Sequence, residues 1–144
     1  MKALGVFRKT EQKTALWIEA VADKMGTTDV ERSYKVLRSV LHALRDRLPP
    51  DEAVHLGAQM PMLVRGFYYE GWDPSRKPER YRHRQEFLEH IAKDVPTLDL
   101  AQREHAASAV FSVLQENISS GETNQVRQAL PAEIRDLWLT SGKD

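Results

Sequence analysis

Apolar residues recur at intervals of three and four positions along most of the chain, the spacing that places them on one face of a helix. The first such stretch spans residues 10–25, and the second runs from about Asp29 to Arg47. No window shows sustained alternation of apolar and polar positions with β-branched side chains, so we expect no β-sheet. The pattern predicts an all-α fold.

Helix start signals divide the chain further. Pro61 interrupts the apolar pattern and is expected to start a new helix, because proline breaks a preceding helix and fits a first turn. Thr28 with Glu31 has the spacing of a capping box, in which two side chains satisfy each other's free backbone N–H groups. Ser119 with Glu122 has the same spacing and predicts another helix start.

The second half of the chain repeats the first. Residues 39–68 align without a gap with residues 109–138, an offset of 70 positions that continues upstream. We infer a tandem duplication of a four-helix unit, which gives about eight helices related by an approximate two-fold axis or by a simple rotation. Matched residues include Val40 and Val110, Leu44 and Leu114, Glu52 and Glu122, Pro61 and Pro131, and Arg65 and Arg135.

A short segment, EGWDPSRKPER, joins the two repeats. Gly71, Pro74 and Pro78 indicate a break in helix, and we expect Pro78 to open the next helix. Because the segment is short, the repeats at residues 1–72 and 73–144 should pack together as one domain.

Composition narrows the class of protein. The 144 residues carry 21 basic and 21 acidic side chains, so the formal net charge is zero and the chain as a whole does not attract polyanions. The lack of cysteine excludes disulfides, thiolate metal ligands and cysteine nucleophiles, and suits a reducing compartment. No apolar run is long enough for a signal peptide or a membrane span. We therefore expect a soluble, cytoplasmic protein.

Motifs of catalysis do not occur in this sequence. There is no GxSxG, no phosphate-binding loop and no GxGxxG, and the seven glycines are scattered. We therefore predict no catalytic residue, no cofactor and no metal ligand, and a protein that is not an enzyme.

Residues 48–72, LPPDEAVHLGAQMPMLVRGFYYEGW, carry a family resemblance. The leucine–proline start, the AQMP break and the RGFYYEGW run resemble an uncharacterised bacterial family, the domain of unknown function numbered twenty-two sixty-seven. The resemblance extends over roughly residues 10–140 and fits both repeats. It implies a soluble all-helical protein and no particular activity. The second repeat departs from the pattern, with LWLTSG where the first has FYYEGW.

Charged residues recur at several matching positions of the two repeats, among them Glu19 and Glu89, and four of those that recur are assigned structural roles. Arg65 and Arg135 each follow a proline by four positions, and Glu52 and Glu122 also match. A polar residue that is present in both repeats serves the architecture more often than a ligand, because an active site seldom needs duplicating. We expect each arginine to tie helices together by an ion pair or by capping carbonyl groups.

Tyr69 and Trp72 are two aromatic residues with two interpretations. Trp72 aligns with Gly142, so the repeat does not account for it. Packing in the seam between the repeats is favoured, because large aromatic side chains bury most of their area. The alternative is that Tyr69 and Trp72 anchor a partner protein.

Residues 75–84, SRKPERYRHR, form a basic segment. Cations at the start of a helix oppose its dipole, which hints at a use such as binding phosphate or an acidic protein. A solvated linker is the favoured interpretation, because short charge runs are usually exposed surface. The candidate partner-binding cations are Arg76, Lys77, Arg80, Arg82 and Arg84, with Tyr81 available to stack on a base.

His83, Glu86 and His90 share one helix face and are the residue types that bind zinc or iron. The first repeat has Lys13, Leu16 and Ala20 at the matching positions, so no second set completes a bundle site. A surface pair of histidines is favoured over a metal site.

Two functional hypotheses follow. The leading one is a non-enzymatic interaction, scaffold or regulatory protein that binds another protein or a second copy of itself. The alternative is weak nucleic-acid binding through the basic segment, with affinity that is steeply salt-dependent.

Overall fold

The computed structural model describes residues 4–142, with side chains through residue 138. Over these residues it is all-α, with eight helices and no strand, which confirms the predicted fold class. The elements are α1 (Gly5–Met25), α2 (Val30–Arg47), α3 (Pro50–Gly57), α4 (Met62–Tyr69), a short 3-10 helix η1 (Pro74–Arg76), α5 (Arg84–Asp94), α6 (Leu100–Asn117), α7 (Ser120–Gln128) and α8 (Ala132–Gly142).

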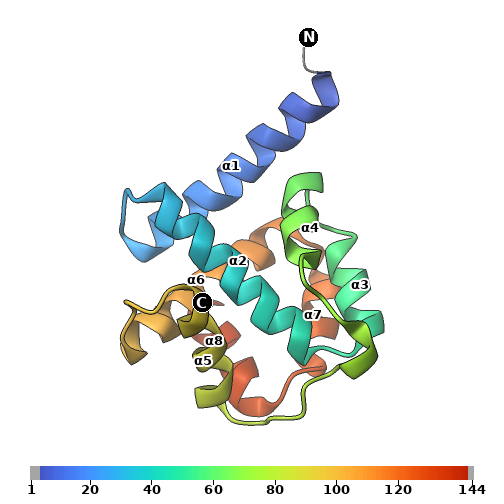
Figure 1. Cartoon of the computed structure of the whole chain (residues 1–144), viewed down its shortest axis with the longest axis vertical. Coiled ribbons are helices and arrows are strands. Elements are labelled where there is room, and N and C mark those ends of the chain that lie inside the picture. Colours follow the sequence, from blue (N-terminus) through green and yellow to red (C-terminus); the bar gives the residue numbers. More distant parts are fainter. Residues whose placement is uncertain (1–3, 143–144) are drawn as a thin grey trace.

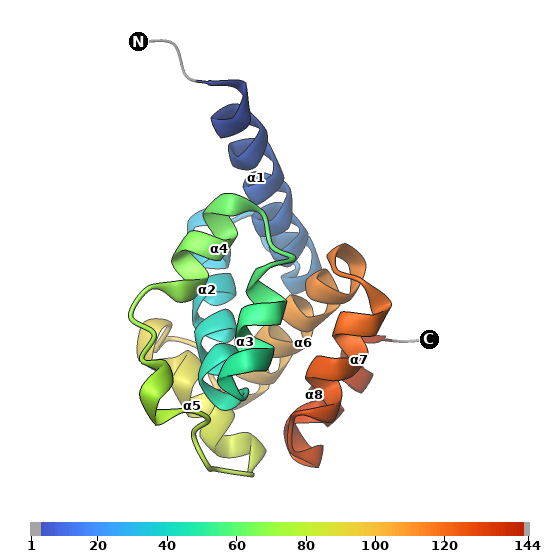
Figure 2. The same ribbon diagram turned by 90° about the vertical axis from the view of Figure 1, so that its right-hand side faces the viewer.

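Helices α2 and α6 form the centre of the molecule, and the other helices pack around them (Figures 1 and 2). Each spans 18 residues and starts after an aspartate whose side chain accepts a hydrogen bond from the third backbone N–H of the helix. These N-caps are Asp29 and Asp99, which lie 70 positions apart. The predicted cap at Thr28 was therefore wrong by one residue, because Asp29 reaches the Arg32 N–H at 3.0 Å.

The helix contacts have the form that an approximate two-fold axis requires. Helix α1 packs on α6, and its counterpart α5 packs on α2. If α1–α4 are exchanged with α5–α8, every principal pair of helices in contact becomes a pair that is also in contact. Two pairs, α2 with α6 and α3 with α7, turn into themselves, so they lie where such an axis would pass.

The largest buried side chains gather around the two central helices. Trp138 stacks on Phe111 with ring centroids 4.4 Å apart, and both are buried. Tyr68, which aligns with Trp138, is also fully buried, and its hydroxyl donates to the Ala53 carbonyl at 2.7 Å. The large apolar core residues of α2 and α6 are Leu37, Leu41, Leu44, Phe111 and Leu114.

Arg65 and Arg135 make the same two hydrogen bonds in their respective repeats. Arg65 donates to the carbonyls of Gly57 and Met60 at 3.0 and 2.9 Å. Arg135 donates to the carbonyls of Arg127 and Leu130, again 70 positions on, at 2.9 and 2.8 Å. Each guanidinium thus satisfies carbonyl groups that the end of α3 or α7 leaves without a helical partner. In each repeat this ties the third helix to the fourth.

The predicted helix start at Pro78 was wrong, because α5 begins at Arg84. The residues between them lie extended along the end of α2. The backbone N–H of Glu79 donates to the Asp46 carbonyl at 2.9 Å, and the Arg47 side chain donates to the Tyr81 carbonyl at 2.8 Å. Backbone groups committed to α2 in this way are not available for a helix.

Helix α1 departs most from the two-fold pattern. It has 21 residues and α5 has 11, and Arg84 at the start of α5 aligns with Thr14. Residues 5–13 therefore form a helical extension, whereas the aligned residues 75–83 belong to the segment between the repeats. This extension projects from the body of the molecule in both views (Figures 1 and 2).

Replacing either Arg65 or Arg135 with Met should destabilise the protein to a similar degree. Each change removes two charge-assisted hydrogen bonds and leaves the partly buried carbonyl of Met60 or Leu130 without its guanidinium donor, so we expect each to lower the free energy of unfolding by about 2–4 kcal/mol. Urea unfolding followed by circular dichroism measures the loss. Arg82→Met, at an exposed position, is the control and should change it by less than about 0.5 kcal/mol. A loss at Arg65 with none at Arg135 would contradict the equivalence of the two repeats.

Candidate functional site

The structure divides the cations of the basic segment into two groups. Lys77 lies 3.1 Å from the Glu79 carboxylate, and Arg84 lies 3.2 Å from that of Glu104, so both charges are offset. The remaining three, Arg76, Arg80 and Arg82, are exposed and form no ion pair with a described residue.

Tyr81 does not provide a surface for a nucleic-acid base. Its ring packs against the core, with His90 stacked at 5.5 Å and the Arg47 guanidinium 5.7 Å from its centre. Burial raises the pKa of its phenol well above the usual value. The expectation that Tyr81 could stack on a base was therefore wrong, because both the core and neighbouring side chains cover the ring.

Tyr69 and Trp72 pack on each other and on the core. Their ring centroids are 5.4 Å apart, and both rings are partly buried. Tyr69 lies over Gly57 of α3, where an added Cβ would come within 2.5 Å of its hydroxyl oxygen. The glycine therefore permits this close approach. A role of the two rings in anchoring a partner stays a prediction.

His83, Glu86 and His90 do not come together as a ligand set. Nδ1 of His83 lies 3.2 Å from the Glu133 carboxylate, and Nε2 of His90 lies 3.0 Å from that of Glu79. Each imidazole thus has its own acidic neighbour from a different part of the chain.

A different ligand set forms where α3 packs on α7. Glu52 and His55 come from α3, and Glu122 comes from the aligned position of α7. One oxygen or nitrogen atom of each side chain lies within 4.8 Å of those of the other two. Within residues 4–142 this is the group of acids and histidines whose geometry could hold a metal ion.

Local hydrogen bonds explain why the Glu122 side chain enters this seam. Ser119 caps α7 by accepting the Glu122 N–H at 3.1 Å, as predicted. The second half of the predicted capping box is absent, because the Ser119 N–H donates to the Gln59 side chain at 2.8 Å instead. Glu122 is therefore not needed at the helix start, and its carboxyl group turns toward Glu52.

The two carboxyl groups form a poorly compensated pair. Glu122 is only 7% exposed, and neither glutamate forms an ion pair with a described residue. One oxygen of each carboxyl group is buried without a hydrogen-bond partner. Burial, followed by the neighbouring Glu52 carboxyl, raises the pKa of Glu122 to about 8. In the absence of a cation, the pair therefore retains a proton at neutral pH.

The sequence contains a signal for this cluster that motif searching missed. Glu52 and His55 stand three positions apart on one helix, a spacing that lets both side chains reach one ion. The offset of 70 then places Glu122 at the position of Glu52 in the second repeat. Only the packing of α3 on α7 shows that the two positions meet.

Comparison with known families gives a match over most of the chain. A profile described as an uncharacterized conserved protein, DUF2267, matches residues 14–137. The chain belongs to the DUF2267 family. A search of curated proteins found no match. Among residues 4–142 of this DUF2267 protein, no helix has the length and apolar character of a membrane span.

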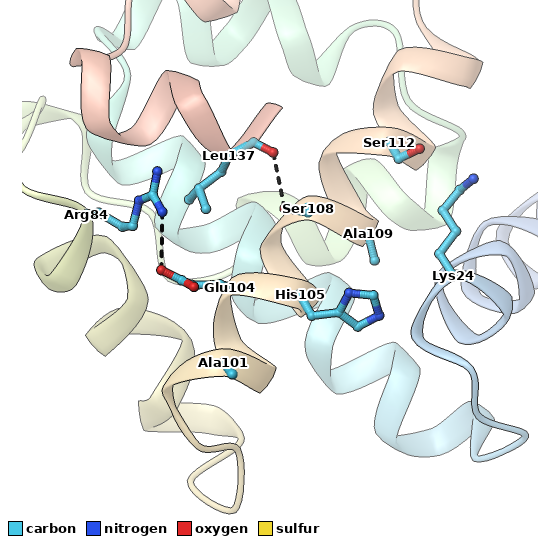
Figure 3. Close-up of a pocket in the computed structure, with 9 residues that line it drawn as sticks. All are labelled: Lys24, Arg84, Ala101, Glu104, His105, Ser108, Ala109, Ser112 and Leu137. Carbon is cyan, nitrogen blue, oxygen red and sulfur yellow. Dashed lines mark hydrogen bonds and ion pairs between the residues drawn. The ribbon is translucent and has the colours of Figure 1, made fainter. Parts of the chain in front are cut away.

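This DUF2267 protein also has an open hollow of about 500 Å³ beside α6 (Figure 3). Small side chains such as Ala109 and Ser112 line α6 here, between Arg84 and Lys24. The aligned positions in the first repeat are filled by larger groups, among them Tyr34, Arg38, His42 and Phe67. The ring of Tyr34 packs on that of Phe67 at 5.3 Å. The hollow thus reflects smaller side chains in the second repeat.

Neither cation that lines the hollow is available to a ligand without competition. Nζ of Lys24 lies 2.8 Å from the Glu116 carboxylate, and Arg84 is paired with Glu104. The seam between α3 and α7 is therefore the stronger candidate site, because its charged groups lack such partners.

Glu122→Gln should stabilise the metal-free protein at high pH. A carboxyl group whose pKa is raised to about 8 on folding stabilises the fold fully below its unfolded pKa, and this contribution is lost as pH rises through 8. The amide cannot ionise, so the variant avoids that loss. At pH 9 with EDTA we expect a gain of at least about 1.4 kcal/mol, the free energy of one pKa unit, and little gain at pH 4.5.

Denaturant unfolding across this pH range measures the effect. Glu89→Gln, at an exposed position of α5, is the control and should leave the pH profile unchanged. A Glu122→Gln variant with the same pH profile as the wild type would show that the pair is not electrostatically strained.

Proposed function

We propose that this DUF2267 protein is a non-enzymatic interaction protein that binds another protein through the start of α1. The observation that carries the proposal is the helical extension of α1, which has no counterpart in α5 and projects from the body (Figure 1). No described part of the chain buries its large apolar side chains.

The extension continues the face by which α1 packs on the body. Thr10, Thr14 and Trp17 lie along that face and are buried. Val6 and Phe7 precede Thr10 by four and three positions, so they belong to the same face. They are nevertheless 50% and 48% exposed, because the body ends before the helix does.

The first turn of α4 extends this exposed area. Met62 and Leu63 are 49% and 45% exposed, and the Leu63 N–H donates to the Thr10 hydroxyl at 3.1 Å. The four side chains therefore border the same junction of α1 and α4. We call Val6, Phe7, Met62 and Leu63 the α1–α4 apolar surface.

The α1–α4 apolar surface suits an amphipathic helix of a partner protein. A helix with an apolar stripe can pack along α1 and bury Phe7 as an anchor. Lys9 and Lys13 are exposed on one flank, so acidic residues beside the partner's stripe would complement them. We favour a protein over nucleic acid, because two of the five cations of the basic segment already pair with acids of the chain.

Substitution within the α1–α4 apolar surface should weaken partner binding. A photo-crosslinking residue at position 7 should capture a partner in cells of the native organism, whereas the same residue at position 16 should not. Leu16 is the matched control, because it lies on another face of α1 and is 64% exposed. Affinity for the captured partner should then fall at least about 30-fold in Val6→Ser/Phe7→Ser, as for a hot-spot residue, and stay within about two-fold in Leu16→Ser.

Equal capture at positions 7 and 16, or a partner whose affinity is unaffected by Val6→Ser/Phe7→Ser, would contradict the proposal. Capture of a second copy of the chain would show that the α1–α4 apolar surface mediates self-association and does not bind an acidic partner helix.

A further inference from the structure

We propose that Glu52, His55 and Glu122 bind one Zn²⁺ ion in the seam between α3 and α7, a metal site that joins the two repeats. The proposal goes beyond partner binding by α1, because it concerns different residues and a different ligand. It rests on the donor set, the distances and the burial of Glu122.

The donor set suits zinc. Two carboxylates and one imidazole are ligands that Zn²⁺ accepts, and three protein ligands leave a fourth position for water. Ligands of a tetrahedral zinc ion with bonds of about 2.0–2.1 Å lie roughly 3.3 Å from one another. The three side-chain atoms are already within 4.8 Å of each other, so small side-chain rotations bring them to that separation. Calcium and magnesium are less suitable, because both prefer sites built from oxygen.

The buried carboxyl group of Glu122 is an independent indication of a ligand. It is more than nine-tenths buried, it points into the cluster, and one of its oxygens has no hydrogen-bond donor among the described residues apart from a proton shared with Glu52. A buried polar atom normally has a partner, and an absent ion is one reason for a missing one. A divalent cation would satisfy this oxygen and offset both carboxylates.

The position of His55 gives the ion a way in. Glu122 is buried and Glu52 is partly buried, whereas His55 is exposed. An ion can therefore reach the carboxylates from the solvent side, and the imidazole then closes the site. The same helix contact explains the role of the metal, since ligands from both repeats would hold α3 to α7.

Calorimetric titration of the EDTA-treated, dialysed full-length protein with Zn²⁺ at pH 7 tests the proposal. We expect one ion per chain. Glu52→Gln, His55→Asn and Glu122→Gln should each weaken binding at least about 100-fold, since loss of even an outer-shell partner costs about 10–100-fold. His105→Asn is the matched control, because His105 is also exposed on a helix but lies outside the cluster. It should leave the affinity within about two-fold.

A gain of affinity provides a second test that does not depend on loss of fold. Gln125 is the residue of α7 that aligns with His55, and it is exposed. Gln125→His would supply a fourth protein ligand from the second repeat and should tighten Zn²⁺ binding at least about ten-fold. Circular dichroism confirms that each variant is folded.

The proposal is overturned if the wild type binds no Zn²⁺, if His105→Asn weakens binding as much as His55→Asn, or if Gln125→His leaves the affinity unchanged.

Discussion

Packing about an approximate two-fold axis forces like residues to meet. Helix α2 contacts its counterpart α6, and α3 contacts its counterpart α7. For apolar residues this is favourable, because each repeat buries its own kind of surface against the other. For charged residues it is unfavourable, because a side chain near the axis lies close to the aligned side chain of the other repeat, which carries the same charge. The charged residues that recur in both repeats must therefore lie away from the axis or be compensated there.

The recurring arginines and glutamates show the two outcomes. Arg65 and Arg135 stay within their own repeats, where each guanidinium donates to two carbonyls. Glu52 and Glu122 lie at the contact of α3 with α7, where burial and mutual proximity raise the pKa of Glu122 to about 8. The same recurrence of residues thus gives two stabilising contacts in one case and a strained pair in the other. That strain is what a proton or a metal ion can relieve.

Sequence pattern predicted those features that depend on local spacing. The all-α fold, the number of helices and the bounds of α2 follow from apolar periodicity and helix start signals. The start of α5 was missed, because hydrogen bonds to the distant end of α2 hold residues 79–81 extended. The projection of α1 was missed for a similar reason. Periodicity shows that a helix has an apolar face, but not where the body that covers this face ends.

Local sequence pattern could not predict the candidate site, and the reason is geometric. No sequence motif includes His55, and Glu52 and Glu122 were assigned to architecture because they recur. The alignment of the repeats gives their equivalence, whereas their contact depends on which helices lie on the axis. If only the contact of α2 with α6 lay on the axis, Glu52 and Glu122 would lie far from each other.

A double-mutant cycle of Glu52→Gln and Glu122→Gln, measured by denaturant unfolding at pH 9 with EDTA, tests most directly whether the two carboxylates oppose each other across the seam. Either single change removes the same repulsion, so the account predicts that the double variant gains less than the sum of the two single gains, by at least about 1 kcal/mol. Additive gains, equal within about 0.5 kcal/mol, would contradict it.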